Sequence, residues 1–138
     1  MEKLWVNLHG GSTHFPIGMM IASVLFDALA YFTSRESYKR DLHAAGFYTL
    51  LLGAAGCFAA VLSGLAISAW QFFGAGKLAK HHDFVWPAFG LMIALAVWRL
   101  VVRGEATRPA FGVYLLFAAL TAALMGAAGY WGGELMGS

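Results

Sequence analysis

The chain has 138 residues, of which 60% are hydrophobic and only 12% are charged. Soluble domains carry about 25% charged residues, so the composition excludes an ordinary soluble protein and indicates an integral membrane protein. The net charge of +2 and the pI near 8.9 come from lysines and arginines that flank apolar runs, and they do not predict nucleic-acid binding.

Four apolar runs divide the chain. Each has the roughly 17 to 25 residues, or more, that a helix needs to cross about 30 Å of hydrocarbon. The polar flanks place the runs at about residues 15–32, 44–73, 84–102 and 110–131. We therefore predict an all-α integral membrane four-helix bundle, with a single transmembrane domain over residues 1–138, in a bacterial cytoplasmic (inner) membrane that the chain crosses several times.

The first run follows the segment LHGGSTHFPIG, which contains His9 and His14. Pro16 fits the first turn of a helix, where its missing N–H would be unsatisfied in any case. The run has no basic region before it and carries Asp27 where the apolar core of a signal peptide would continue. We therefore expect a retained helix rather than a cleaved signal.

Asp27 belongs to a second polar group. His43 and Arg99 are expected at a similar depth on the second and third helices. A carboxylate inside a membrane usually has a partner and is a functional candidate by default. An ion pair of Asp27 with Arg99 or His43 that fixes helix packing is the favoured interpretation, and a proton path or a quinone-headgroup site is the alternative.

Similar segments recur in the two halves of the chain. GMMIA at residues 18–22 returns as GLMIA at 90–94, and GAAGCF at 53–58 returns as GAAGYW at 126–131. These matches predict two repeated helical hairpins related by an axis along the membrane normal, although chains rich in Gly and Ala also produce such matches by chance. The GAAG segments suit close helix packing, and Cys57, the single cysteine, has no partner for a disulfide.

The positive charges predict the orientation. Six lie in or beside the first and third loops: Arg35, Lys39, Arg40, Arg99, Arg103 and Arg108. Three lie at the N-terminus or in the second loop: Lys3, Lys77 and Lys80. The positive-inside rule then places the first and third loops in the cytoplasm, and both termini and the second loop on the outer side. This orientation gathers four of the five histidines at the outer surface: His9, His14, His81 and His82.

Histidines at one membrane level can bind a cofactor. Two neutral imidazoles from different helices can occupy both axial positions of a b-type haem, and we predict His14 and His82 as that pair. Around it we expect glycines that let a backbone approach the macrocycle and a tryptophan that excludes water. These residues are Gly129, Gly132, Gly133 and Trp86.

Two other interpretations of the histidines stay open. They can be interfacial residues that hydrogen-bond to water or backbone near helix starts. They can also bind zinc, copper or non-haem iron together with Glu134, and the metal set is then His9, His14, His81 and His82. The chain contains no phosphate-binding glycine loop and no GxSxG motif, so the only enzymatic role it suggests is that of a quinol-linked redox subunit.

The segment HGGSTHFPIG and the later segment GYWGGEL resemble the opening HFPIA box and the closing GYxGGxL box of a family of small bacterial four-helix membrane proteins, catalogued as a domain of unknown function. Some relatives carry this module beside a Rieske-type iron–sulfur domain, which implies electron transfer. By this likeness His14 and Pro16 match the opening box, and the glycines of GYWGGEL match the closing one. The chain departs from the family at Gly10, where a proline is usual, and at Gly18, where an alanine is usual; relatives often continue past the closing glycines to another histidine.

The sequence thus predicts a small b-type cytochrome that holds haem near the outer face and passes electrons between a quinol and an outer-side redox protein. One alternative is a cofactor-free accessory or assembly subunit of a larger membrane complex. Another is a histidine-gated metal or solute transporter. The lipid bilayer is an expected partner in every case, and the bundle can be a monomer or a homo-oligomer.

Overall fold

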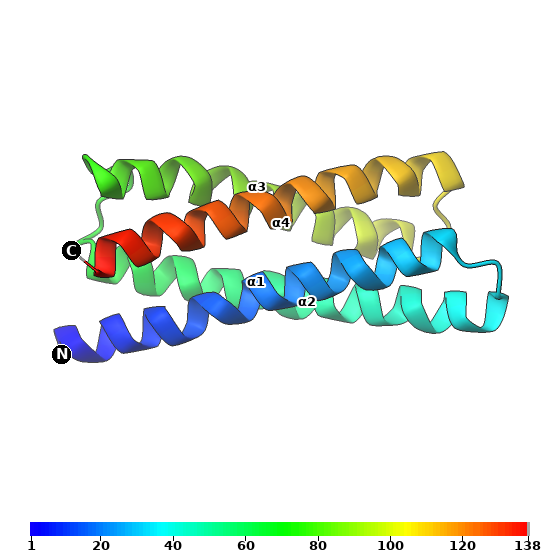
Figure 1. Cartoon of the computed structure of the whole chain (residues 1–138), viewed down its shortest axis with the longest axis horizontal. Coiled ribbons are helices and arrows are strands. Elements are labelled where there is room, and N and C mark those ends of the chain that lie inside the picture. The colour runs from blue at the N-terminus through cyan, green and yellow to red at the C-terminus, as the bar shows by residue number, and fades with distance from the viewer. Residues whose placement is uncertain (138) are drawn as a thin grey trace.

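The computed structural model describes residues 1–137, which form four long helices in an antiparallel bundle (Figure 1). The helices are α1 (Glu2–Phe32), α2 (Glu36–Ile67), α3 (Lys77–Val102) and α4 (Arg108–Met136). Residues 1–137 contain no strand. Each helix is long and apolar enough to cross a membrane. The predicted all-α fold with four membrane-spanning helices is therefore confirmed.

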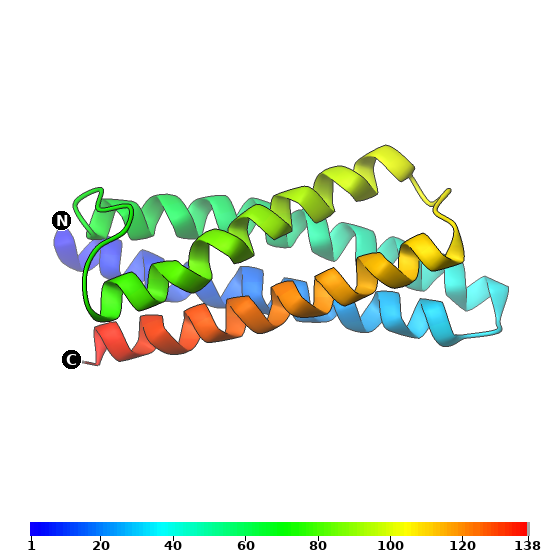
Figure 2. The same cartoon turned by 90° about the horizontal axis from the view of Figure 1, so that it is seen from above.

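The helices run alternately up and down, so both termini lie at the same end as the α2–α3 loop (Figures 1 and 2). We call this the histidine end, because His9 and His81 lie near it, and we call the opposite end the Asp27 end. α1 packs against α2 and α4, and α3 packs against α4 and α2, whereas α1 and α3 do not contact one another closely. α1 and α3 are therefore diagonal in the bundle.

α1 begins at Glu2, about four turns before the predicted start near residue 15. Pro16 consequently lies inside the helix rather than in its first turn, and it cannot donate to the carbonyl of Ser12. A glycine on α2 accommodates it, because a Cβ at Gly56 would lie 3.3 Å from Pro16 Cδ. The apolar run marks only the part of a helix that crosses hydrocarbon, whereas the helix itself continues into the more polar segment LHGGSTH.

α2 extends from Glu36 to Ile67, which shifts both ends of the predicted 44–73 run toward the N-terminus. The helix ends because Ala69 and Trp70 have φ values of 51° and 62°, in the left-handed region. The aromatic segment that follows is a loop, and Trp86 holds it by donating from Nε1 to the carbonyl of Phe72 at 2.7 Å. Hydropathy alone does not distinguish such an interfacial aromatic loop from a spanning segment.

The other two helices also begin before their predicted runs. α3 begins at Lys77 rather than near residue 84, and α4 begins at Arg108 rather than near residue 110. The Oγ1 of Thr107 accepts a hydrogen bond from the backbone N–H of Ala110 and caps the start of α4. α4 ends at Met136, beyond the predicted end near residue 131.

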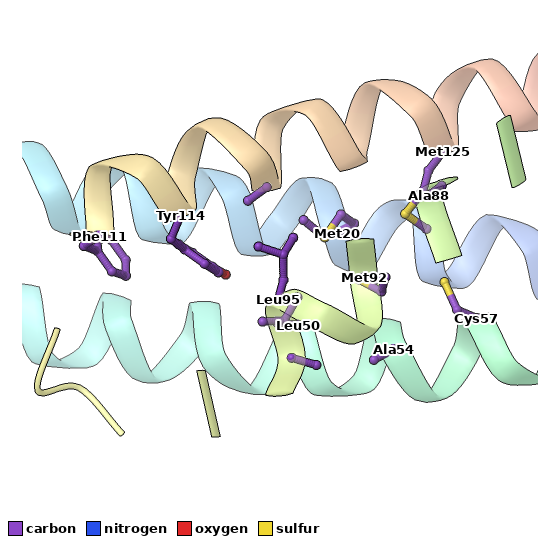
Figure 3. Close-up of a cluster of buried hydrophobic side chains, with 12 residues drawn as sticks. Met20, Leu50, Ala54, Cys57, Ala88, Met92, Leu95, Phe111, Tyr114 and Met125 are labelled. Carbon is purple, nitrogen blue, oxygen red and sulfur yellow. The ribbon is translucent and has the colours of Figure 1, made fainter. Parts of the chain in front are cut away.

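The buried core follows the bundle axis, with Met20 and Met92 at its centre (Figure 3). The buried positions of α1 recur 72 residues later in α3: Pro16, Met20, Ser23 and Asp27 correspond to Ala88, Met92, Leu95 and Arg99. Those of α2 recur 68 residues later in α4: Gly46, Leu50, Gly53 and Cys57 correspond to Tyr114, Ala118, Thr121 and Met125. The offsets of 72 and 68 residues thus align the hairpins α1–α2 and α3–α4 as the two units of the predicted repeat.

Only one of the two sequence matches marks equivalent positions. GMMIA and GLMIA are 72 residues apart, in agreement with the register of α1 and α3. The GAAG segments are 73 residues apart and do not occupy equivalent positions. Gly53 is buried and a Cβ there would lie 2.7 Å from Met92 Cε, whereas Gly126 is exposed and a Cβ there would meet nothing within 4 Å. The close packing predicted for GAAG holds for α2 but not for Gly126.

Candidate functional site

A cavity of about 380 Å³ lies among the four helices at the histidine end. The four histidines predicted to lie at one membrane level all line it: His9 and His14 from α1, and His81 and His82 from α3. The residues predicted to surround a haem line it as well: Trp86, Gly129, Gly132 and Gly133. Residues that are far apart in the sequence therefore meet at one site.

His9 is half-buried and held against α2. Its Nδ1 lies 3.1 Å from the carbonyl oxygen of Ala60 and 3.0 Å from Oγ of Ser63. The Ser63 hydroxyl itself donates to the carbonyl of Ala60, and a carbonyl oxygen only accepts hydrogen bonds, so Nδ1 is the donor and Nε2 keeps its lone pair. Gly64 makes room for the ring, since a Cβ there would lie 2.9 Å from His9 Cε1.

His81 has the same arrangement in the second hairpin. Its Nδ1 donates to the carbonyl of Ala128 at 2.8 Å, and a Cβ at Gly132 would lie 3.3 Å from His81 Cε1. The three residues of this arrangement correspond to those around His9 at the offsets of the repeat, 72 for the histidine and 68 for the alanine and glycine. We call the two sets, His9–Ala60–Gly64 and His81–Ala128–Gly132, the imidazole cradles.

The cradles leave two basic nitrogens unused. Within residues 1–137 neither Nε2 makes a hydrogen bond. The two rings come from the diagonal helices α1 and α3 and line the same cavity. Histidines that bind metals usually donate their other ring N–H to a carbonyl or carboxylate, which fixes the tautomer and the ring orientation. The hydrogen bonds of His9 and His81 thus fix their rings in the way that is common for metal-binding histidines.

His14 and His82 differ from the cradle histidines. His14 is exposed and makes no hydrogen bond within the described part of the chain. His82 is only 7% exposed, and its Nδ1 is enclosed without a hydrogen-bond partner among the described residues. Neither ring is fixed by a carbonyl. The sequence offered a signal that separates the two pairs, because His9 and His81 are 72 residues apart, like the two related segments GMMIA and GLMIA.

Glu134 is not brought to the cavity. It pairs with Lys77 at the surface, where Nζ lies 3.6 Å from its carboxylate. Among residues 1–137, no three or more His, Cys, Asp or Glu side chains are grouped so that they could hold one metal ion. The histidines surround a shared cavity instead of converging on a point.

The second predicted polar group lies at the Asp27 end. Asp27 is fully buried, and its Oδ2 accepts hydrogen bonds from Arg99 Nη1 at 2.6 Å and from the hydroxyl of Tyr114 at 3.2 Å. Arg99 also donates to the carbonyl of His43 at 3.0 Å, and His43 Nδ1 lies 3.8 Å from Asp27 Oδ1. The predicted ion pair of Asp27 with Arg99 is confirmed, and it joins the diagonal helices α1 and α3.

Tyr114 was not among the residues predicted for this group. A tyrosine within an apolar run is a signal that could have identified it, because a buried hydroxyl needs a hydrogen-bond partner. Gly46 is the other unforeseen member. A Cβ at this position would overlap the carboxylate of Asp27, so the absence of a side chain is what lets α2 cover the buried charge.

A family model described as "Predicted membrane protein (DUF2231)" matches residues 6–138. The match covers nearly the whole chain and agrees with the resemblance to a membrane-protein family of unknown function and with a multi-pass location. No curated protein and no solved structure matches the chain.

Proposed function

The chain belongs to the DUF2231 family of predicted membrane proteins, and we propose that it is a small b-type cytochrome with one haem in the cavity at the histidine end. The two imidazole cradles carry this proposal. Bis-histidine haem takes one imidazole on each face, and bundle interiors are a common place for such cofactors. When bound, the haem would supply one-electron transfer.

The cavity suits this ligand in its lining and its donor set. Its volume of about 380 Å³ falls in the range of roughly 300 to 1,000 Å³ that is usual for cofactor sites. Its walls are mainly apolar, with Ile17, Val61 and Phe89 among the lining residues. Gly126 and Gly133 leave open space where a side chain would otherwise project. A flat, apolar macrocycle would need such walls, and the cradle histidines would hold its iron.

We propose His9 and His81 as the ligands, in place of the pair His14 and His82 expected from the sequence. Within residues 1–137, only the cradle histidines have an Nδ1–H held by a carbonyl and an Nε2 with an unused lone pair. The hydrogen bond to the carbonyl also raises the basicity of the ligand. Each hairpin would then supply one of the two histidines that hold the group.

The remaining lining residues would control how far water reaches a bound haem and how deeply the haem is buried. Trp86 and Phe89 line the cavity and would shield a bound haem from water. Trp86 is fixed by its hydrogen bond to the α2–α3 loop. A site at a membrane boundary supports the exchange of electrons with a lipid-soluble quinol on one side. On the other side it supports electron exchange with an outer-side redox protein or a larger membrane complex.

The test is a spectrum of the full-length chain, purified in detergent from cells with ample haem. We expect a low-spin b-type spectrum that changes on dithionite reduction, and a pyridine haemochrome that identifies haem b. His9→Leu and His81→Leu should each abolish the low-spin signal. The matched variants His14→Leu and His82→Leu should keep it, because both residues lie in the same cavity but outside the cradles.

Two results would contradict this proposal. A colourless wild-type protein that is folded and helical would remove the cytochrome and favour a cofactor-free accessory subunit. Loss of the low-spin signal in the His14 and His82 variants, with retention in the cradle variants, would return the ligand role to the pair expected from the sequence.

A further inference from the structure

His82 is a buried polar residue that the two cradles do not use. It lines the cavity, is 7% exposed, and has an Nδ1 that is enclosed without a hydrogen-bond partner in the described chain. Its ring lies 5.7 Å from that of His81 and 5.9 Å from that of Trp86. The equivalent position in the first hairpin is Gly10, so this imidazole is present on one side of the cavity only.

The surroundings of His82 determine its tautomer. A neutral imidazole has one N–H and one lone pair. An N–H at the enclosed Nδ1 would have no acceptor, and a buried donor without an acceptor is costly. The proton is therefore favoured on Nε2, the ring nitrogen that is not enclosed. Neighbouring His81 has the opposite tautomer, because its Nδ1 donates to Ala128.

We infer that His82 is a hydrogen-bond donor to a carboxylate of the ligand in the cavity, and not an iron ligand. This inference rests on the proposed function. The polar substituents of haem b are its two propionates, and an imidazole N–H is a suitable partner for a carboxylate. His81 and His82 then have different roles: the first presents a lone pair to iron, and the second presents an N–H to the haem periphery.

The charges around the start of α3 favour an anion. Lys77 and Lys80 lie in the first turn, which contains no acidic residue, and the N-terminus of a helix carries a partial positive charge. Lys77 is paired with Glu134, whereas Lys80 lies over the ring of Trp131 at 4.8 Å from the ring centre. Asp83 follows His82 but is exposed. Of the two lysines, only Lys80 has no acidic partner among the described residues, so Lys80 is the cation that a propionate near His82 could meet.

The experiment compares haem with its dimethyl ester, which has the same macrocycle and no carboxylate. Each is titrated into the full-length apoprotein in one detergent, and binding is followed by absorption. For each protein we compare the ratio of its affinity for haem to its affinity for the ester. This ratio should be about tenfold higher for the wild type than for His82→Leu, since a hydrogen bond to a charged group contributes about that factor. Comparing the two ratios cancels the different partition of the two porphyrins into detergent.

Two further variants separate a hydrogen bond from a packing effect. His82→Gln keeps an N–H donor and should keep most of the preference for haem. His14→Leu removes another cavity histidine and should leave the preference at the wild-type value. All these variants should retain the low-spin spectrum, because His9 and His81 are unchanged.

Three results would overturn the inference. An unchanged preference in His82→Leu would exclude the hydrogen bond to a carboxylate. Loss of the low-spin spectrum in both His82 variants, with its retention in His81→Leu, would make His82 an iron ligand. Binding of neither porphyrin by the wild type would remove the proposed function together with this inference.

Discussion

At the scale of single residues, the buried carboxylate of Asp27 restricts which side chains can lie next to it. A charge buried in the bundle costs several kcal/mol unless it is paired and hydrogen-bonded. Arg99 and Tyr114 supply both at Oδ2, whereas Oδ1 has no hydrogen-bond partner among the described residues. The Arg99 guanidinium also lies over the Tyr114 ring at 5.1 Å from its centre. Asp27 and Arg99 occupy equivalent positions in the two hairpins. The two hairpins thus carry opposite charges at equivalent positions, and the ion pair of Asp27 with Arg99 links the hairpins.

This ion pair predicts that the effects of the two substitutions on the free energy of unfolding are strongly non-additive. Asp27→Ala or Arg99→Ala leaves one buried charge without its partner, and each should lower the free energy of unfolding by about 3 to 5 kcal/mol. The double variant leaves no unpaired charge and should lose less than the sum of the two single losses. Unfolding in detergent, followed by far-UV circular dichroism, measures this cycle. Additive losses would show that the two charges are not coupled.

Gly46 predicts a second effect at this site. Its Cβ would overlap the Asp27 carboxylate, so Gly46→Ala must displace the charge or the helix. We expect a loss of about 3 kcal/mol in the free energy of unfolding. Gly18→Ala is the matched control, because nothing lies within 4 Å of a Cβ there, and it should be neutral or stabilise by up to about 1 kcal/mol. Equal effects of the two substitutions would contradict the packing argument.

At the scale of helices, the sequence predicts which segments are helical better than where they begin and end. The apolar runs identified all four helices because the hydrocarbon requirement is strong. They missed the start of α1, since polar residues and glycines beyond the hydrocarbon look like a loop. They also extended α2 beyond Ile67, because the apolar aromatics of the α2–α3 loop look like a spanning segment. Both errors occur at the membrane boundary, where composition is mixed.

The sequence showed two pairs of related segments, but only the pair in α1 and α3 has the offset that the buried positions show. The segments at residues 18 and 90 give the offset of α1 and α3 correctly, and this offset pairs His9 with His81. The GAAG segments give an offset of 73 residues between α2 and α4, whereas the buried positions give an offset of 68 residues. Short patterns of Gly and Ala recur without structural equivalence. The cradles depend on the carbonyls of Ala60 and Ala128, which no side-chain pattern reveals.

The two cradles predict a graded effect of glycine substitutions on haem binding. Gly64→Ala would place a Cβ 2.9 Å from His9 Cε1, and Gly132→Ala would place one 3.3 Å from His81 Cε1. Each should displace an imidazole and weaken haem binding, by about tenfold or more for Gly64→Ala and by less for Gly132→Ala. Haem titration of the apoprotein measures both affinities.

Gly90→Ala is the control for the cradle substitutions. Gly90 is exposed on α3 and does not line the cavity, and a Cβ there would meet nothing within 4 Å. This variant should keep the wild-type spectrum and an affinity within about threefold of the wild type. If Gly64→Ala bound haem as tightly as Gly90→Ala, the cradle around His9 would not position a ligand.

At the scale of the whole molecule, the helix lengths place the cavity at a membrane boundary. α1 has 31 residues and is about 46 Å long, so it projects beyond about 30 Å of hydrocarbon at its ends. His9 and His81 lie within the first three turns of α1 and α3. The cavity is therefore expected near the headgroups, where its ligand is within reach of both lipid-soluble and water-soluble partners.

The side of the membrane on which the cavity lies is the last prediction. The Asp27 end has six lysines and arginines in or beside its loops, against three at the histidine end, so the positive-inside rule places the Asp27 end in the cytoplasm. In bacterial cells, alkaline phosphatase fused after Gly137 should be active, and green fluorescent protein fused there should be dark. Fusions after Glu105, in the α3–α4 loop, should give the opposite results. The reverse pattern would put the four cavity histidines on the cytoplasmic side, and the electron-transfer partner would then have to be a cytoplasmic protein.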